Sequence, residues 1–275
     1  MSLRINQNIA ALNAHRNLSV TDGQMAKSLE KLSSGFRINR AADDAAGLSI
    51  SEGLRSQVGG LKVAVRNAQD GVSVAQTAEG ALTEVTSMLQ RMRDLTVQAG
   101  NTGSNGGATG DAVSSIQDEI DSLSTAINNV ATRTKFNGTA LLDGSTATLT
   151  FQVGANGGET QTITLSDMKA ATLKTDTVDV TANTTTADLK TIDDAIKTVS
   201  TFRGKLGAAQ NTFEHTINNL NVAVENLSAS ESRIRDTDMA SEMVDFTRSQ
   251  ILSQAGTAML AQANSASQGV LRLLQ

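Results

Sequence analysis

The 275-residue chain contains no cysteine, proline, tryptophan or tyrosine, and aromatic residues make up only 2% of it. Without cysteine it can form no disulfide, no thiolate metal site and no cysteine nucleophile. The complete lack of proline, against an average usage of about 5%, favours continuous helices with few sharp turns. Because aromatic side chains usually supply much of a globular core, the buried surface must be aliphatic and thin.

Charge and hydropathy exclude further classes of protein. The net charge is −5 and no basic tract is present, which argues against binding to nucleic acid or to an anionic membrane. The first thirty residues lack an apolar core of the kind that a secretory signal needs, so we expect no cleavable signal peptide. The longest uncharged stretch, residues 249–271, contains ten Ser, Thr, Gln or Asn residues among its 23, so we expect no membrane insertion.

The pattern of apolar residues predicts one very long helix. From residue 54 to 92 they recur in steps of four and three, which gives the helix a heptad-like seam. Asp43 and Asp44 suit its N-terminus and Gly100 suits its end, so we expect it to run from about 44 to 99. Such a helix is about 80 Å long, whereas a compact chain of this length is about 50 Å across, so an elongated molecule is expected.

The remainder of the chain repeats this pattern with one interruption. A shorter helix opens at Asp111, a second long seam follows Thr185, and both chain ends are amphipathic and aliphatic. Between them, apolar residues alternate with Thr or Gln over 147–165, which predicts a β-hairpin, and Val178 and Val180 indicate another weak strand. The predicted fold class is mainly α: an elongated antiparallel bundle or coiled coil of long helices, with a small β-hairpin region in mid-chain.

Five glycines lie beyond the first turn of the first long helix, where each costs about 1 kcal/mol relative to alanine. Two interpretations remain open: close approach of a neighbouring helix or subunit, which we favour, or drift on an exposed face. The positions are Gly53, Gly59, Gly60, Gly71 and Gly80.

Residues that could support enzyme chemistry are few. His15 and His215 are 200 residues apart on predicted helices, so ordinary surface or seam positions explain them better than a catalytic pair. The acidic doublets 43–44 and 193–194 suit the first turns of helices better than a metal site. We therefore expect no catalytic residues, no cofactor, no metal and no enzyme activity.

Several stretches, in their order and spacing, resemble bacterial flagellin over residues 1–142 and 190–275. No single motif is specific, but the whole series is. The stretches include Glu30-Lys-Leu-Ser-Ser-Gly-Phe-Arg-Ile-Asn-Arg40, Asp43-Asp-Ala-Ala-Gly-Leu-Ser-Ile-Ser-Glu52, Gln76-Thr-Ala-Glu-Gly-Ala-Leu82 and Ala258-Met-Leu-Ala-Gln-Ala-Asn264.

The resemblance implies a short flagellin whose outer variable domain is nearly absent. Helices of an inner tube would come from residues 1–40 and 237–275. A surrounding shell would come from residues 41–142, with two helices, and residues 191–236, with one long helix. Residues 143–190 would hold the β-hairpin, expected to belong to the shell, and what remains of the variable segment.

The function implied is that of a structural subunit that polymerises into the flagellar filament for swimming motility. Such a subunit is extracellular and is exported through the flagellum's own type III apparatus. The alternative is the hook-filament junction protein of the same superfamily, which shares the terminal patterns but typically lacks the central motifs.

In the predicted helices at the two chain ends, Ala, Ser, Gln and Gly take many positions of the apolar face. These helices should therefore be too weak to fold alone and should be covered by neighbouring copies. The residues expected to mediate polymerisation are Ile5, Ile9, Leu12, Leu29, Leu32, Phe246, Ile251, Met259, Leu260, Leu271 and Leu274.

The resemblance also implies partners. Gln90, Arg91, Leu95 and Glu119 match the patch through which flagellins bind the vertebrate Toll-like receptor 5, and Arg91 and Leu95, four residues apart, should share a helix face. Packing of subunit against subunit is the alternative role for these residues. The C-terminal helix resembles the segment wrapped by a flagellar export chaperone, and flagellar cap and hook-junction proteins are further expected partners.

Overall fold

The computed structural model describes residues 7–101, 110–182 and 185–273, with side chains up to Ser265. Contacts divide the chain into two units. Unit 1 joins the two ends of the chain, up to Gln57 and from Asn226 onward, and unit 2 spans Val58–Glu225. The predicted class, mainly α with a small β region, is confirmed.

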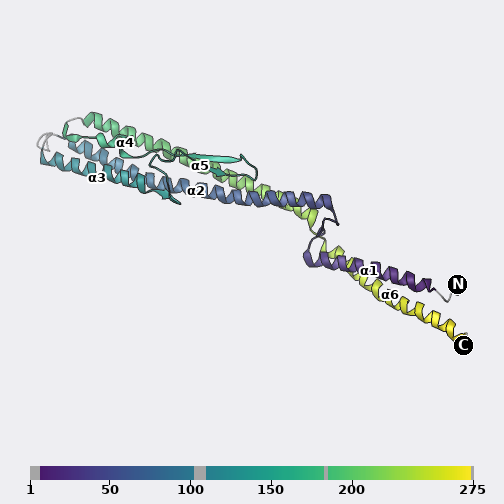
Figure 1. Ribbon diagram of the computed structural model, residues 1–275. Helices are drawn as coiled ribbons and strands as arrows, with labels where there is room; N and C mark the ends of the chain where they lie inside the picture. The colour runs from purple at the N-terminus through teal and green to yellow at the C-terminus, as the bar shows by residue number, and fades with distance from the viewer. Residues whose placement is uncertain (1–6, 102–109, 183–184, 274–275) are drawn as a thin grey trace. The chain divides into compact units, whose positions relative to one another are not determined.

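Long helices form the frame of unit 2: α2 (Ala45–Ala99, of which residues 58–99 belong here), α3 (Asp111–Arg133) and α5 (Thr185–Arg235) (Figure 1). All three lie where the apolar periodicity predicts them. α2 and α5 are antiparallel, because Arg93 pairs with Asp193 at 2.8 Å while Glu79 pairs with Arg203 at 3.6 Å.

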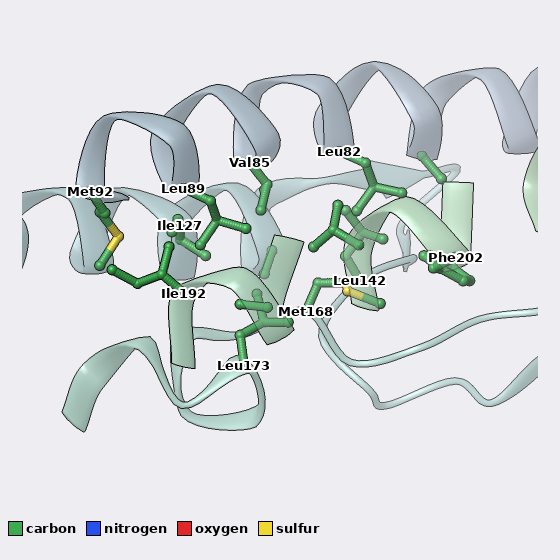
Figure 2. Close-up of a cluster of buried hydrophobic side chains, with 14 of the residues drawn as sticks. Leu82, Val85, Leu89, Met92, Ile127, Leu142, Met168, Leu173, Ile192 and Phe202 are labelled. Carbon is green, nitrogen blue, oxygen red and sulfur yellow. The ribbon is translucent and has the colours of Figure 1, made fainter. Parts of the chain in front are cut away.

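The core of unit 2 is a continuous aliphatic seam along α2. Leu82, Val85, Leu89 and Met92 follow the predicted steps of three and four and are fully buried. Figure 2 shows side chains from α3, α5 and the segment between them converging on this row. The converging residues include Ile127, Leu142, Met168, Leu173, Ile192 and Phe202.

The predicted β-hairpin is confirmed and is anchored to the helices of unit 2. Strands β3 (Thr148–Gln152) and β4 (Thr160–Thr164) pair antiparallel. On β3, Phe151 meets the ring of Phe213 edge to face, with centroids 5.5 Å apart. Asn67 on α2 donates its side-chain amide to the carbonyl of Gln152 at 2.9 Å.

A second, very short hairpin precedes it. Strands β1 (Lys135–Phe136) and β2 (Thr139–Ala140) pair across a two-residue turn. Asn137 and Gly138 occupy that turn with φ of 46° and 82°, which is the left-handed pair that such hairpins require.

The expectation of a strand at Val178 and Val180 is wrong. The segment instead contains α4 (Ala170–Leu173) and two 3₁₀ turns, η1 (Thr175–Thr177) and η2 (Val180–Ala182). The side chain of Gln117 on α3 takes the place of a strand neighbour. Its amide nitrogen donates to the carbonyl of Val178 at 3.0 Å, and its oxygen accepts from the N–H of Val180 at 2.9 Å.

Unit 1 is built around α1 (Ile9–Ser34) and α6 (Met239–Leu273), which lie side by side (Figure 1). Asn8 caps α1 by accepting from the N–H of Ala11 at 3.0 Å, and Gly35 ends the helix with a φ of 76°. Asp44, one of the predicted N-terminal carboxylates, accepts from the N–H of Gly47 at the start of α2.

The five helix glycines divide between the two interpretations. A Cβ at Gly71 would lie 2.8 Å from the ring of Phe213, and one at Gly60 would lie 3.1 Å from Ala155 at the hairpin turn. Both positions therefore serve close approach within the chain. Gly53, Gly59 and Gly80 have nothing within 4 Å of such a Cβ.

Two alanine substitutions in α2 should move stability in opposite directions. Gly80→Ala should stabilise unit 2 by up to about 1 kcal/mol, because the site is open and alanine favours the helix. Gly71→Ala should destabilise it, since an overpacking cost of about 1–3 kcal/mol exceeds the same helix gain. Urea unfolding of the full chain, followed by circular dichroism, measures both.

A double variant tests whether the Phe213 ring causes the destabilisation expected of Gly71→Ala. In a Phe213→Leu background the added Gly71→Ala should lose its penalty, because the ring that it meets is gone. An equal penalty in both backgrounds would contradict the close-approach explanation.

Candidate functional site

α1 and α6 meet along two heptad seams. On α6, the half-buried and buried residues up to Ser265 are spaced alternately four and three positions apart. The half-buried and buried residues of α1 have the same spacing, except for the additional Glu30 and Lys31. The seams consist mostly of small or polar residues. They are Ala11, Ala14, Leu18, Thr21, Met25, Ser28 and Leu32 on α1, and Glu242, Phe246, Ser249, Ser253, Gly256, Leu260 and Ala263 on α6.

Polar contacts fix the antiparallel register of this seam at three levels. Asn8 donates its amide to the carbonyl of Ala263 at 2.9 Å, and Ser253 donates its hydroxyl to Asp22 at 3.0 Å. Lys31 pairs with Glu242 at 3.4 Å, where the Glu242 side chain is only 12% exposed. A slip along the seam would break all three contacts.

Most large apolar side chains of these helices lie outside the seam, which holds only Leu18, Met25, Leu32, Phe246 and Leu260 among the described residues. In the described part of the chain, 15 large apolar side chains are exposed, and twelve of them belong to unit 1. Of the 33 buried apolar residues in the same part, only Ile38 belongs to unit 1. We call the members on α1 and α6 the outward apolar surface: Ile9, Leu12, Val20, Leu29, Met239, Met243, Val244, Ile251, Leu252 and Met259.

Part of this surface forms a shallow groove on α6. The groove has a volume of about 470 Å³ and is lined mainly by apolar atoms. Its lining residues come from two consecutive turns and are Met243, Val244, Thr247, Arg248, Ile251 and Leu252.

A separate polar cluster joins α2 to α3 in unit 2. Arg91 donates to the Glu119 carboxylate through Nε and Nη2, each at 2.8 Å, and both side chains are about half exposed. This hydrogen bond raises the pKa of the Arg91 guanidinium above its usual value.

Groups suited to catalysis or metal binding do not gather in the described residues. His15 and His215 are exposed on different units. Within residues 7–101, 110–182 and 185–273, no three His, Asp or Glu side chains are arranged to hold a metal ion. None of the described helices is long and apolar enough to cross a membrane.

Comparison with known proteins decides the family. Residues 5–147 match the model of the bacterial flagellin N-terminal helical region, and residues 189–274 match that of the C-terminal helical region. The chain belongs to the bacterial flagellin family.

Individual flagellins and related proteins are similar over most of their length. The chain is 51% identical to flagellin of Bacillus subtilis, covering 99% of this chain and 100% of that protein. It is 44% identical to the flagellar filament 33 kDa core protein of Treponema phagedenis, over 98% and 99% of the two chains. The crystal structure of Bacillus cereus flagellin matches 56% of this chain and 88% of its own, at 30% identity and a TM-score of 0.50.

A further solved structure, of a protein assigned as flagellar hook-associated from Vibrio parahaemolyticus, matches with a TM-score of 0.59. The match covers 70% of this chain and all of that one, but the identity is 16%. This likeness therefore extends to the fold alone.

The structure places the expected polymerisation residues of this flagellin in two groups. Ile9, Leu12, Leu29, Ile251 and Met259 lie on the outward apolar surface, while Leu32, Phe246 and Leu260 are half-buried in the seam. Ile5 and Leu274, and the side chain of Leu271, lie outside the described residues.

The expected polymerisation residues do not include five members of the surface: Val20, Met239, Met243, Val244 and Leu252. A signal for two of them exists. Val244 and Ile251 are seven residues apart, as are Leu252 and Met259, and residues at that spacing share one face of a heptad helix.

The four residues of the expected receptor patch are not equally accessible. Gln90 and Arg91 are exposed, and Glu119 is joined to Arg91. Leu95, expected on the same face as Arg91, is only 2% exposed and belongs to the core of unit 2.

Substitutions at two of these positions should have very different effects on stability. Leu95→Ala should lower the free energy of unfolding of unit 2 by about 2–5 kcal/mol, because it opens a cavity in a packed core. Arg91→Ala should leave unfolding almost unchanged, since exposed ion pairs contribute little. Thermal unfolding of the purified monomer measures both, and equal destabilisation would contradict the assigned burial.

Proposed function

We propose that this chain builds the flagellar filament by polymerising through the outward apolar surface of α1 and α6. The observation that carries the proposal is the distribution of apolar side chains. Among the residues with described side chains, twelve of the 15 large exposed ones belong to unit 1, in which Ile38 alone is a buried apolar residue. Monomeric soluble proteins rarely expose large contiguous apolar patches unless a partner covers them.

The partner that fits this surface best is another copy of the chain. A seam of small and polar residues gives α1 and α6 little stability of their own, so their folding is completed when neighbouring copies bury the outward apolar surface. Contacts between different surfaces of identical subunits generate an open helical tube when the rotation between subunits does not close into a ring. In this proposal the helix pair forms the inner tube and unit 2 contributes the shell.

The relatives support a filament subunit over a hook-filament junction protein. The two relatives described above align over almost their entire length and are named flagellin and filament core protein. The hook-associated structure adds no weight to the alternative, because its likeness is one of fold.

The proposed location is the extracellular filament, reached through the type III apparatus of the flagellum. Before assembly, an export chaperone would cover the groove on α6, whose apolar lining suits a helix-binding partner. Cap and hook-junction proteins would meet the same terminal helices at the ends of the filament. Each of these partners competes with neighbouring copies for one surface.

Replacing one outward side chain should impair assembly without unfolding the monomer. Ile251→Gln should raise the concentration needed for polymerisation by at least about tenfold, because a buried Ile contributes about 1.5–3 kcal/mol. Sedimentation and electron microscopy of the purified chain measure this. Ile251→Leu, which keeps the apolar contact, is the matched control and should polymerise normally.

Normal assembly of Ile251→Gln would contradict the proposal. Failure of both variants would also contradict it, since an apolar replacement should preserve a contact made by burial. Circular dichroism of both monomers should match that of the parent chain, because Ile251 is exposed before assembly.

We also propose that Arg91, Gln90 and Glu119 form the accessible part of a patch recognised by Toll-like receptor 5. Arg91→Ala should lower binding of the monomer to the receptor ectodomain, measured by surface plasmon resonance. Arg93→Ala is the control, because Arg93 is a neighbouring half-exposed arginine with its own ion pair, to Asp193. Equal binding by the parent and Arg91→Ala would contradict the assignment, as would equal loss in both variants.

A further inference from the structure

The methionines with known side-chain positions fall into sharply different environments. On α6, Met239, Met243 and Met259 are 47%, 49% and 65% exposed. In the core of unit 2, Met92 and Met168 are 0% exposed. Met25 and Met88 are half-buried. The three well-exposed thioethers therefore belong to a single helix and to the outward apolar surface.

The composition of the chain makes these three side chains the first targets of an oxidant. With no Cys, Trp or Tyr present, methionine is the readily oxidised side chain that remains. No thiol can react with an oxidant before the methionines do. Solvent access then decides which methionines react, and among the methionines with described side chains the three well-exposed ones are all on α6.

The chemistry is a two-electron oxygen transfer from a hydroperoxide. A lone pair on the methionine sulfur attacks one oxygen of hydrogen peroxide, the O–O bond breaks, and water leaves after proton transfer. The sulfur is oxidised to a sulfoxide and the peroxide is reduced. The product side chain is polar and chiral, and it disrupts contacts that depend on an apolar thioether.

We propose that Met239, Met243 and Met259 form an oxidation-sensitive site. Oxidation of these methionines in the free subunit blocks its assembly, and assembly in turn shields them from oxidants. Met243 lines the groove on α6, beside Val244 and Ile251, so a sulfoxide there places a polar group in an apolar contact. Met259 shares a heptad position with Leu252 on the same surface. The proposal rests on polymerisation through that surface.

Shielding follows from the same geometry. Hydrogen peroxide must reach the sulfur, and burial removes that access, as it does for Met92 and Met168. If neighbouring copies cover α6, its methionines become as inaccessible as those of the core. Oxidation then acts on subunits before assembly and spares those already in a filament.

The experiment treats purified full-length monomer and assembled filaments with hydrogen peroxide and measures sulfoxide at each methionine by peptide mass spectrometry. In the monomer, the three α6 methionines should be oxidised before Met92 and Met168. In filaments they should be protected. Oxidised monomer should fail to assemble or should need at least about tenfold more protein, the loss expected from spoiling one apolar contact.

A variant with Met239→Leu, Met243→Leu and Met259→Leu separates modification from other damage. It should assemble normally and keep this ability after peroxide treatment, because leucine preserves volume and hydrophobicity. A matched control with Met25→Leu and Met88→Leu should remain sensitive. Treatment of oxidised parent protein with methionine sulfoxide reductases A and B should restore assembly.

Loss of assembly in the peroxide-treated triple variant would overturn the assignment of the site to the three α6 methionines. Oxidation of Met92 and Met168 as fast as the α6 methionines would also overturn it. Equal oxidation of monomer and filament would overturn the shielding. Should the triple variant fail to assemble without oxidant, the three single leucine variants, each expected to lower sensitivity, take its place. Polymerisation of untreated parent protein tests the proposed function independently of all these outcomes.

Discussion

The structure of the terminal helices depends on one constraint: α1 and α6 meet along a seam in which small or polar residues outnumber large apolar ones. Ala11, Ala14, Ser249 and Gly256 bring the two helices together but bury little apolar area. Most of the large apolar side chains on the same helices, such as Ile251, Leu252 and Met259, are exposed instead. Unit 2 shows the opposite arrangement, with its aliphatic residues gathered along α2. One chain thus contains a unit with a buried aliphatic core and a helix pair whose large apolar side chains are mostly exposed.

The polar contacts in the seam have a different role from the apolar surface. The contacts of Asn8, Asp22 and Lys31 add little stability at half-exposed positions, but each can be satisfied only in one antiparallel register. A seam of alanine and serine alone would tolerate slippage by a heptad. Fixing the register fixes where Val244, Ile251 and Leu252 stand relative to Leu12 and Val20, so the surface offered to a neighbour has one defined pattern.

Periodicity predicts the helices and the β3–β4 hairpin because each depends on residues close together in sequence. The 3-4 pattern of α2 and the alternation around residues 154–158 needed no knowledge of distant contacts. The segment at Val178 could not be predicted in this way, because its backbone is satisfied by Gln117, some 60 residues earlier. The close packing at Gly71 likewise depends on a distant partner, Phe213 of α5. In the candidate site, the weakness of the terminal helices was visible from composition, but which face of each helix stays outward was not.

The small number of large apolar residues in the seam links folding of the helix pair to the proposed polymerisation. If leucine stood at Ala11, Ala14 and Ser249, the seam would be a conventional coiled coil and would gain burial energy within the monomer. The helix pair would then be stable alone, and association would add only the outward contacts to an already folded pair. In the proposed assembly, the thin seam couples folding of the pair to contact with neighbours, so the ordered state is favoured chiefly where other subunits are present. The same thin seam leaves the methionines of α6 exposed, so the oxidation proposed for them follows from how little apolar surface the helix pair covers by itself.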